Sequence, residues 1–211
     1  MAVYNKGIFG ACKGKIGKLV FYELNGKQVV RTQGKHNRQA TVLQLQNRAE
    51  LNAVMQFLKP IREFVNAGFE KAARGSTKSA YNVAVSYNKR NAVTGTYPDV
   101  TIRYESAGLT EGTMNRADAP AVELTTAGLS FSWACPPDLP WPRPNDQVML
   151  LAYFPELQSA EYILYGVARF ECAAILSLPA ALLTEHMEVY ISFIAQDRKQ
   201  VANSSYLGRF N

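Results

Sequence analysis

The residue types that most often carry chemistry are scarce in this sequence. The two histidines are His36 and His186, and neither has the H-E-x-x-H spacing of a metal-binding helix. The sequence contains no C-x-x-C pair and no G-x-S-x-G nucleophile elbow. We therefore predict that the protein is not an enzyme, uses no cofactor, and has no catalytic, cofactor-binding or metal-binding residues.

The glycine-rich opening invites comparison with two nucleotide-binding patterns. The stretch Gly10-Ala11-Cys12-Lys13-Gly14-Lys15-Ile16 is one residue shorter than a phosphate-binding loop, and Ile16 stands where Mg²⁺ needs a hydroxyl group. Gly14-Lys15-Ile16-Gly17 matches the G-x-x-G of KH domains, but a KH loop joins two helices and this one precedes a predicted strand. Glycines that permit tight turns are the simpler interpretation.

A cluster of basic residues is the strongest candidate for a binding site. Phe21 and Tyr22 lie within it, and such a surface can hold single-stranded nucleic acid through phosphate contacts and base stacking. A protein partner and plain solvation are the alternatives. The basic residues of this cluster are Lys13, Lys15, Lys18, Lys27, Arg31, Lys35 and Arg38.

Charge is divided unevenly along the chain. Residues 1–90 contain 16 Lys and Arg residues and four acids, whereas residues 91–211 contain seven and 13, so the two net charges are +12 and −6. This asymmetry predicts that the two parts face different partners. Other protein subunits are the favoured partners, and the basic half of one copy could meet the acidic half of another.

The second candidate is Trp141, which lies in a dense proline loop between residues 136 and 144. Its indole is either an exposed interaction anchor or a cap on the end of the fold. The three cysteines, Cys12, Cys135 and Cys172, are odd in number and widely spaced. They predict buried free thiols in a reducing compartment rather than a disulfide framework, although Cys135 and Cys172 could face each other.

Several features bear on location. No apolar run approaches the roughly 20 residues of a membrane helix, so we predict no membrane span. The segment from Met1 to Gly7 has no apolar core, which argues against a signal peptide. A cytoplasmic or virion-associated protein is therefore expected.

The first part of the chain has the pattern of a hairpin followed by helices. Asn25-Gly26 separates the β-rich runs 18–24 and 27–32, which predicts a two-residue hairpin loop. An apolar stripe at helical spacing then begins after Thr41, a plausible N-cap, and continues past Pro60. A third helix is expected near residues 79–88.

After residue 91 the pattern changes to short alternating runs separated by turns. This pattern predicts an antiparallel β-sandwich with Trp133 buried between its sheets. The expected strands are 100–104, 122–125, 129–135, 147–154, 162–172, 189–195 and 206–210. The fold class is thus α+β, with a basic hairpin-and-helix module at residues 1–96 and an immunoglobulin-like sandwich at residues 97–211.

Two resemblances support this layout. The run 129–137, with Trp133 followed by prolines, resembles the second strand of a fibronectin type III domain, and 189–195 resembles its sixth. In addition, ordered short matches along most of the chain resemble a functionally uncharacterised family of about this length from Bacteroidota. These matches include Gly14-Lys15-Ile16-Gly17, the segments 29–31, 57–61 and 79–82, Gln44, Gln46, Arg48, Trp133 and Asn145-Asp146.

These observations together favour a non-enzymatic structural or interaction protein. We expect a subunit of a bacterial or phage (virion) assembly that works through contacts with other protein subunits, including its own copies. The alternative is a nucleic-acid-associated protein that uses the basic N-terminal half.

Overall fold

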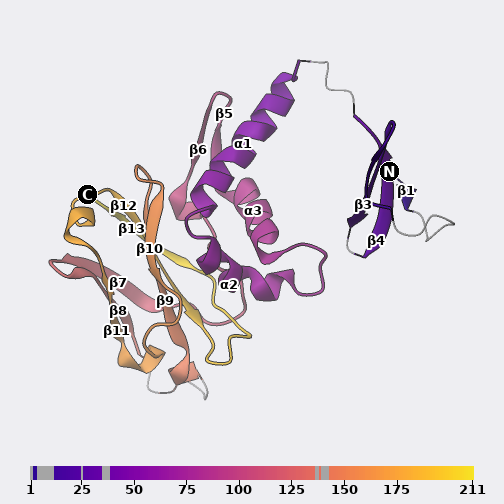
Figure 1. The fold of residues 1–211 in the computed structure, drawn as a ribbon. Coiled ribbons are helices and arrows are strands. Elements are labelled where there is room, and N and C mark those ends of the chain that lie inside the picture. Colours follow the sequence, from indigo (N-terminus) through magenta and orange to yellow (C-terminus); the bar gives the residue numbers. More distant parts are fainter. Residues whose placement is uncertain (1, 4–11, 25, 35–38, 136–137, 139–142) are drawn as a thin grey trace. The chain divides into compact units, whose positions relative to one another are not determined.

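The computed structural model describes residues 2–3, 12–24, 26–34, 39–135, 138 and 143–211, and Figure 1 shows its fold. Contacts within the chain divide it into two compact units, Met1–Thr41 and Val42–Asn211. The described residues of the first unit form strands but no helix, and the second unit contains helices and strands. The α+β class predicted from the sequence is confirmed.

The first unit is a four-stranded antiparallel sheet with the order β1-β4-β3-β2. Leu24 pairs with Lys27, so the predicted hairpin with a two-residue loop is confirmed. Gly26 has a φ of +75°, which a glycine adopts without steric cost, while Asn25 lies outside the described residues. The strands are β1 (Ala2–Val3), β2 (Gly14–Ile16), β3 (Leu19–Leu24) and β4 (Lys27–Thr32).

The second unit opens with the three predicted helices. Most of their apolar stripe is buried, although Leu51 and Met55 of the first helix are exposed. Pro60 stands between the first two helices because proline cannot continue a helix. The hydroxyl of Ser79 caps the third helix by accepting a hydrogen bond from the Asn82 N–H at 3.2 Å. The helices are α1 (Val42–Leu58), α2 (Arg62–Ala73) and α3 (Ala80–Asn91).

A short hairpin and two larger antiparallel sheets complete this unit. The sheets have the orders β11-β8-β7 and β10-β9-β12-β13, and their facing side chains form one hydrophobic core. The strands are β5 (Val93–Thr96), β6 (Asp99–Ile102), β7 (Asp118–Thr125), β8 (Gly128–Ala134), β9 (Gln147–Phe154), β10 (Ser159–Ile163), β11 (Ala173–Ser177), β12 (Met187–Ile194) and β13 (Ser205–Phe210).

Two strand predictions differ from the structure. The run 162–172 is not one strand, because β10 ends at Ile163 and a 3₁₀ turn occupies Arg169–Glu171. β11 was not predicted, since its sequence, Ala-Ala-Ile-Leu-Ser, contains one β-branched residue and no aromatic one.

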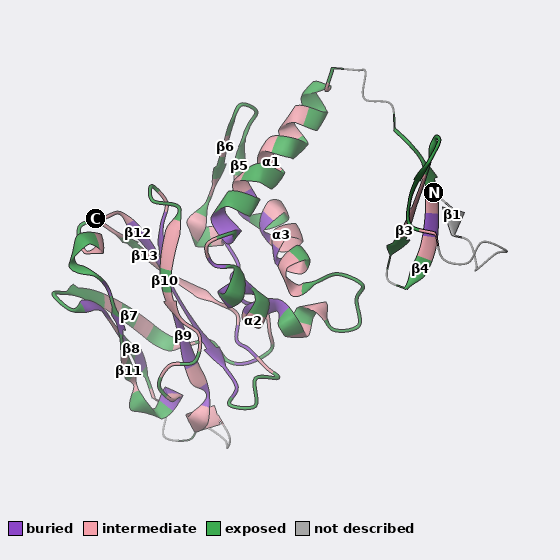
Figure 2. Cartoon of the chain, viewed as in Figure 1, coloured by how far each residue is buried: buried purple, intermediate pink, exposed green. Residues whose placement is uncertain are grey.

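In the sheet β10-β9-β12-β13, the two central strands are buried on both faces, as Figure 2 shows for β9 and β12. Val148 and Leu150 of β9 pack against β8, whereas Met149 and Leu151 pack against the helices. This alternation follows from the two-residue period of a strand. Helices and sandwich therefore share one unit, and the predicted boundary between residues 96 and 97 falls in the turn of the β5–β6 hairpin.

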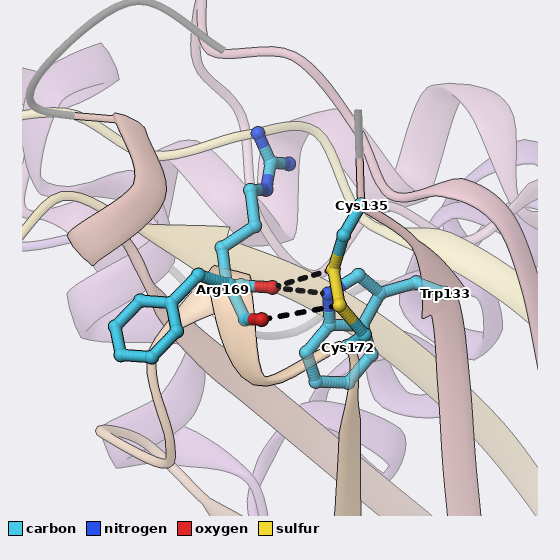
Figure 3. The surroundings of a disulfide bond; sticks show 5 residues. Trp133, Cys135, Arg169 and Cys172 are labelled. Carbon is cyan, nitrogen blue, oxygen red and sulfur yellow. Dashed lines mark hydrogen bonds between the residues drawn. A yellow bond between two sulfur atoms is a disulfide. The ribbon is translucent and has the colours of Figure 1, made fainter. Parts of the chain in front are cut away.

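The end of β8 carries a disulfide bond between Cys135 and Cys172 (Figure 3). The prediction of buried free thiols is therefore wrong for this pair. The sequence suggested otherwise because the cysteine count is odd and the two partners are 37 residues apart. The cysteine-based argument for a reducing compartment also fails, since disulfides form and persist where conditions are oxidising.

Candidate functional site

Strand register brings part of the predicted basic cluster onto one face of the N-terminal sheet. Lys15 lies opposite Val20, and Val20 lies opposite Arg31. Lys27 lies opposite Leu24, which has the same orientation as Val20 because the two are four residues apart on β3. Lys15, Lys27 and Arg31 therefore share a face, and all three side chains are exposed. We call this surface the basic face.

Tyr22 lies between Val20 and Leu24 on the same strand, so it points to the basic face as well. Its direct cross-strand neighbour is Val29, and Arg31 and Lys27 lie in the next pairs of this face, one on either side. A tyrosine near lysine and arginine can stack on a base or fill a pocket in a protein partner. The basic face thus combines positive charge with an aromatic ring.

The other members of the cluster are placed differently. Lys13 forms an exposed ion pair with Glu23 at 3.4 Å, which contributes little to stability. Lys18 lies in the turn before β3, where its carbonyl oxygen accepts a hydrogen bond from the Gln33 N–H at 2.8 Å. Lys35 and Arg38 lie outside the described residues, as does the predicted anchor Trp141.

The two units of the structure also differ in net charge. Met1–Thr41 contains eight Lys and Arg residues and one acid, a net charge of +7. Val42–Asn211 contains 15 and 16, a net charge of −1. The net positive charge of the protein thus comes from the segment Met1–Thr41.

Few side chains are buried in the part of the N-terminal sheet whose burial is described. There, Val29 is the one buried hydrophobic side chain. Ile16, Leu19 and Leu24 are 63%, 42% and 49% exposed. Isolated units of about 40 residues usually need a disulfide, a metal or a partner to be stable.

A polar pocket in the second unit was not predicted. It has a volume of about 440 Å³ and lies between the end of α3, the segment 105–116 and the start of β13. The charged residues in its lining are Glu105, Glu111 and Arg116, and Tyr87 and Tyr206 provide aromatic rings. No sequence signal identifies it, because its three segments are far apart in the chain and have no common motif.

Buried hydrogen bonds fix the wall of this pocket. The side chain of Asn88 is fully buried and holds both backbone groups of Gly108: its Nδ2 donates to the Gly108 carbonyl at 2.7 Å, and its Oδ1 accepts from the Gly108 N–H at 3.0 Å. Thr110 Oγ1 donates to the Ala202 carbonyl at 2.7 Å. Satisfied buried polar groups of this kind specify a single backbone path.

Two glycines allow the close packing around the pocket. A Cβ atom at Gly108 would lie 2.4 Å from the Tyr87 ring, and one at Gly112 would lie 1.9 Å from the Val201 carbonyl oxygen. Both distances are far shorter than a van der Waals contact. The backbone can therefore lie this close to Tyr87 and Val201 only because positions 108 and 112 are glycines.

Tyr206 connects the pocket to a buried carboxylate. Its hydroxyl donates to Oε2 of Glu188, whose Oε1 lies 3.0 Å from His186 Nε2 and 3.1 Å from Arg209 Nε. Burial, together with the Glu188 charge, raises the pKa of Tyr206 far above its usual value. Within the described residues, no serine, threonine or cysteine bonds to His186, so this cluster holds β12 and β13 together without forming a nucleophile relay.

Two further searches concern the described part of the chain. Its histidines, cysteines and acids do not form any group of three or more that could hold a metal ion. None of its helices combines the length and the hydrophobicity that a membrane crossing requires.

The family of unknown function DUF6266 has a sequence model that matches residues 11–208 of this protein. The chain belongs to this family. The match covers strands β2–β4 as well as the pocket, so both candidate sites lie within the DUF6266 region. Comparison with curated proteins and with solved structures found no match. The expected membership of a functionally uncharacterised family is thereby confirmed.

Proposed function

We propose that this DUF6266 chain is a non-enzymatic interaction protein, a subunit of a bacterial or phage (virion) assembly whose N-terminal sheet docks on a partner protein. The observation that carries the proposal is the combination, in one small unit, of a net charge of +7 with the exposed apolar side chains of Ile16, Leu19 and Leu24. A surface of this kind gains stability when a complementary partner covers it.

The second unit supplies the scaffold, and we assign it an immunoglobulin-like sandwich. The first, second and fifth of its strands β7–β13 form one sheet, and the other four form the second sheet. Trp133 packs between these sheets with 4% of its surface exposed, as expected for the fibronectin type III resemblance. Sandwiches often serve as assembly modules, although this support is an analogy between folds.

The disulfide supports the virion alternative over the cytoplasmic one. Cys135 and Cys172 are bonded in the folded chain, and virion and cell surfaces are among the oxidising settings in which disulfides persist. The resemblance to a Bacteroidota family supports a bacterial or phage origin for the assembly.

Nucleic-acid binding is the second candidate function, and the basic face favours it. Lys15, Lys27 and Arg31 share one face of the sheet with Tyr22, an arrangement that suits phosphates and stacked bases. The exposed apolar residues of the same unit favour a protein partner over a nucleic acid, since phosphate backbones do not cover such side chains.

The test is a native pull-down from the source organism with the full chain, with and without nuclease. The bait is compared with a Lys15→Glu, Lys27→Glu, Arg31→Glu variant and with a matched control, Lys59→Glu, Lys78→Glu, Arg90→Glu, which reverses three exposed charges of the second unit. We expect a protein that survives nuclease, is lost with the first variant and is kept with the control. Loss upon nuclease treatment would favour the nucleic-acid alternative.

A further inference from the structure

The polar pocket has free hydrogen-bonding groups of both kinds. Within the described residues, no hydrogen bond or ion pair engages the charged ends of Glu105, Glu111 and Arg116. The amide nitrogen of Asn203 is also available, because its Oδ1 alone is engaged, at 2.9 Å from the Gly112 nitrogen. Two carboxylates that accept, and a guanidinium and an amide that donate, therefore line one concave surface.

The sign of the charges narrows the class of ligand. An anion such as phosphate would meet two carboxylates and one guanidinium, so repulsion would outweigh attraction. A polycation would meet the guanidinium of Arg116 in the same small space. A neutral ligand that carries many hydroxyl groups can instead donate to Glu105 and Glu111 and accept from Arg116 and Asn203.

The aromatic rings and the volume agree with this class. Tyr87 and Tyr206 line the pocket and are half-buried, so parts of their rings are available to pack against C–H groups of a ligand. The volume of about 440 Å³ lies within the range of roughly 300–1,000 Å³ found for small-molecule sites. The buried bonds of Asn88, Thr110 and Ser204 hold the wall in place before any ligand arrives.

We propose that this pocket binds a neutral polyhydroxylated small molecule, a mono- or disaccharide. The site is independent of whatever the N-terminal sheet binds. Glu105 and Glu111 accept hydrogen bonds from neighbouring hydroxyl groups of the sugar, Arg116 and Asn203 donate to its oxygens, and the two tyrosine rings contact its C–H face.

The test is saturation-transfer difference NMR on the full chain with five separate probes: glucose, galactose, mannose, N-acetylglucosamine and maltose. Inorganic phosphate and spermidine are titrated in parallel by calorimetry. The site variant is Glu105→Gln, Glu111→Gln, and the matched control is Glu123→Gln, Glu161→Gln, which removes the same charge from exposed positions on β7 and β10. Circular dichroism confirms that both variants fold.

We expect at least one saccharide to bind, with an affinity that falls about tenfold or more in the site variant and is unchanged in the control, because each lost bond involves a charged acceptor. The proposal is overturned if none of the five saccharides binds, or if their binding is the same in the site variant. It is also overturned if phosphate or spermidine binds instead and the site variant alters that binding.

Discussion

The indole Nε1 of Trp133 donates a hydrogen bond to the carbonyl oxygen of Arg169 at 2.7 Å (Figure 3). This bond joins the end of β8 to the 3₁₀ turn that precedes β11. The Arg169 guanidinium lies 3.9 Å from the centroid of the Phe193 ring and donates to the Asn115 carbonyl at 2.6 Å. A single buried arginine therefore links four segments at this end of the sandwich.

Replacement of Trp133 should lower the free energy of unfolding of the second unit. Trp133→Ala is expected to lower the free energy of unfolding by about 3–5 kcal/mol, through lost burial and a cavity. Trp133→Phe keeps most of the packing and removes the donor to Arg169, so we expect a loss of about 1–3 kcal/mol. Urea unfolding followed by circular dichroism measures both, and a Trp133→Phe variant as stable as the unaltered protein would contradict the role of the indole N–H.

The disulfide should stabilise the second unit. Its partners are 37 residues apart, and the chain-entropy model gives about 4 kcal/mol for a loop of that length. A reducing agent should therefore lower the thermal unfolding midpoint of the protein. A Cys135→Ser, Cys172→Ser variant should start at the lower midpoint and not respond to the reductant. A midpoint that is the same with and without reductant in the unaltered protein would show that the bond does not form.

Stability should fall on the alkaline side. Burial raises the pKa of Tyr153 to about 12, and burial and the Glu188 charge raise the pKa of Tyr190 and Tyr206 well above the usual value. In the unfolded chain these phenols titrate near pH 10. A raised folded-state pKa gives a contribution that is complete below about pH 10 and is lost as the pH rises through the folded-state value.

The measurement for this pH dependence is the free energy of unfolding from about pH 8 to 11, with phenolate absorbance recorded in parallel. Tyr206→Phe should reduce the slope above about pH 10, because one raised group is gone. Tyr97→Phe, at an exposed tyrosine, is the control and should leave the slope unchanged. A slope that Tyr206→Phe does not alter would contradict this assignment.

The glycines of the pocket wall should differ in their tolerance of alanine. Gly112→Ala directs a Cβ atom onto a backbone oxygen of Val201, which cannot rotate away, whereas Gly108→Ala meets the side chain of Tyr87. We expect losses of roughly 1–3 kcal/mol, with Gly112→Ala the larger. Gly34→Ala, where a Cβ atom meets nothing within 4 Å, is the control. The thermal unfolding midpoints of the three variants measure these losses, and the midpoint of Gly112→Ala should be the lowest.

The basic face should bind nucleic acid weakly if at all. If six or more phosphates were contacted, the affinity for an oligonucleotide would fall by roughly 10³-fold or more between 50 and 200 mM salt. We expect weak, salt-sensitive oligonucleotide binding at most, together with salt-sensitive association between chains. Fluorescence anisotropy and light scattering at the two salt concentrations measure these quantities, and tight oligonucleotide binding at 200 mM would place the nucleic-acid role first.

Local signals in the sequence were enough for the elements that depend on local chemistry. Asn25-Gly26 identified the hairpin, and apolar spacing identified the three helices. β11 was missed because its residues have weak strand preference, and the Cys135–Cys172 bond was missed because spacing along the chain does not report distance in space. The pocket depends on Asn88 reaching Gly108 across 20 residues, and no pattern in one sequence reveals such a contact.

Because the side chains of β9 pack on both faces of the sheet, the chain can be shortened only as far as both faces stay covered. Met149, Leu151 and Tyr153 face the helices, while Val148, Leu150 and Phe154 face β8 and its neighbours. A fragment of residues 97–211 would lose the helices that cover one face, and the exposed apolar side chains would promote aggregation. An N-terminal truncation should therefore keep all residues from Val42 onward. Expression of the strands alone should give inclusion bodies rather than a soluble domain.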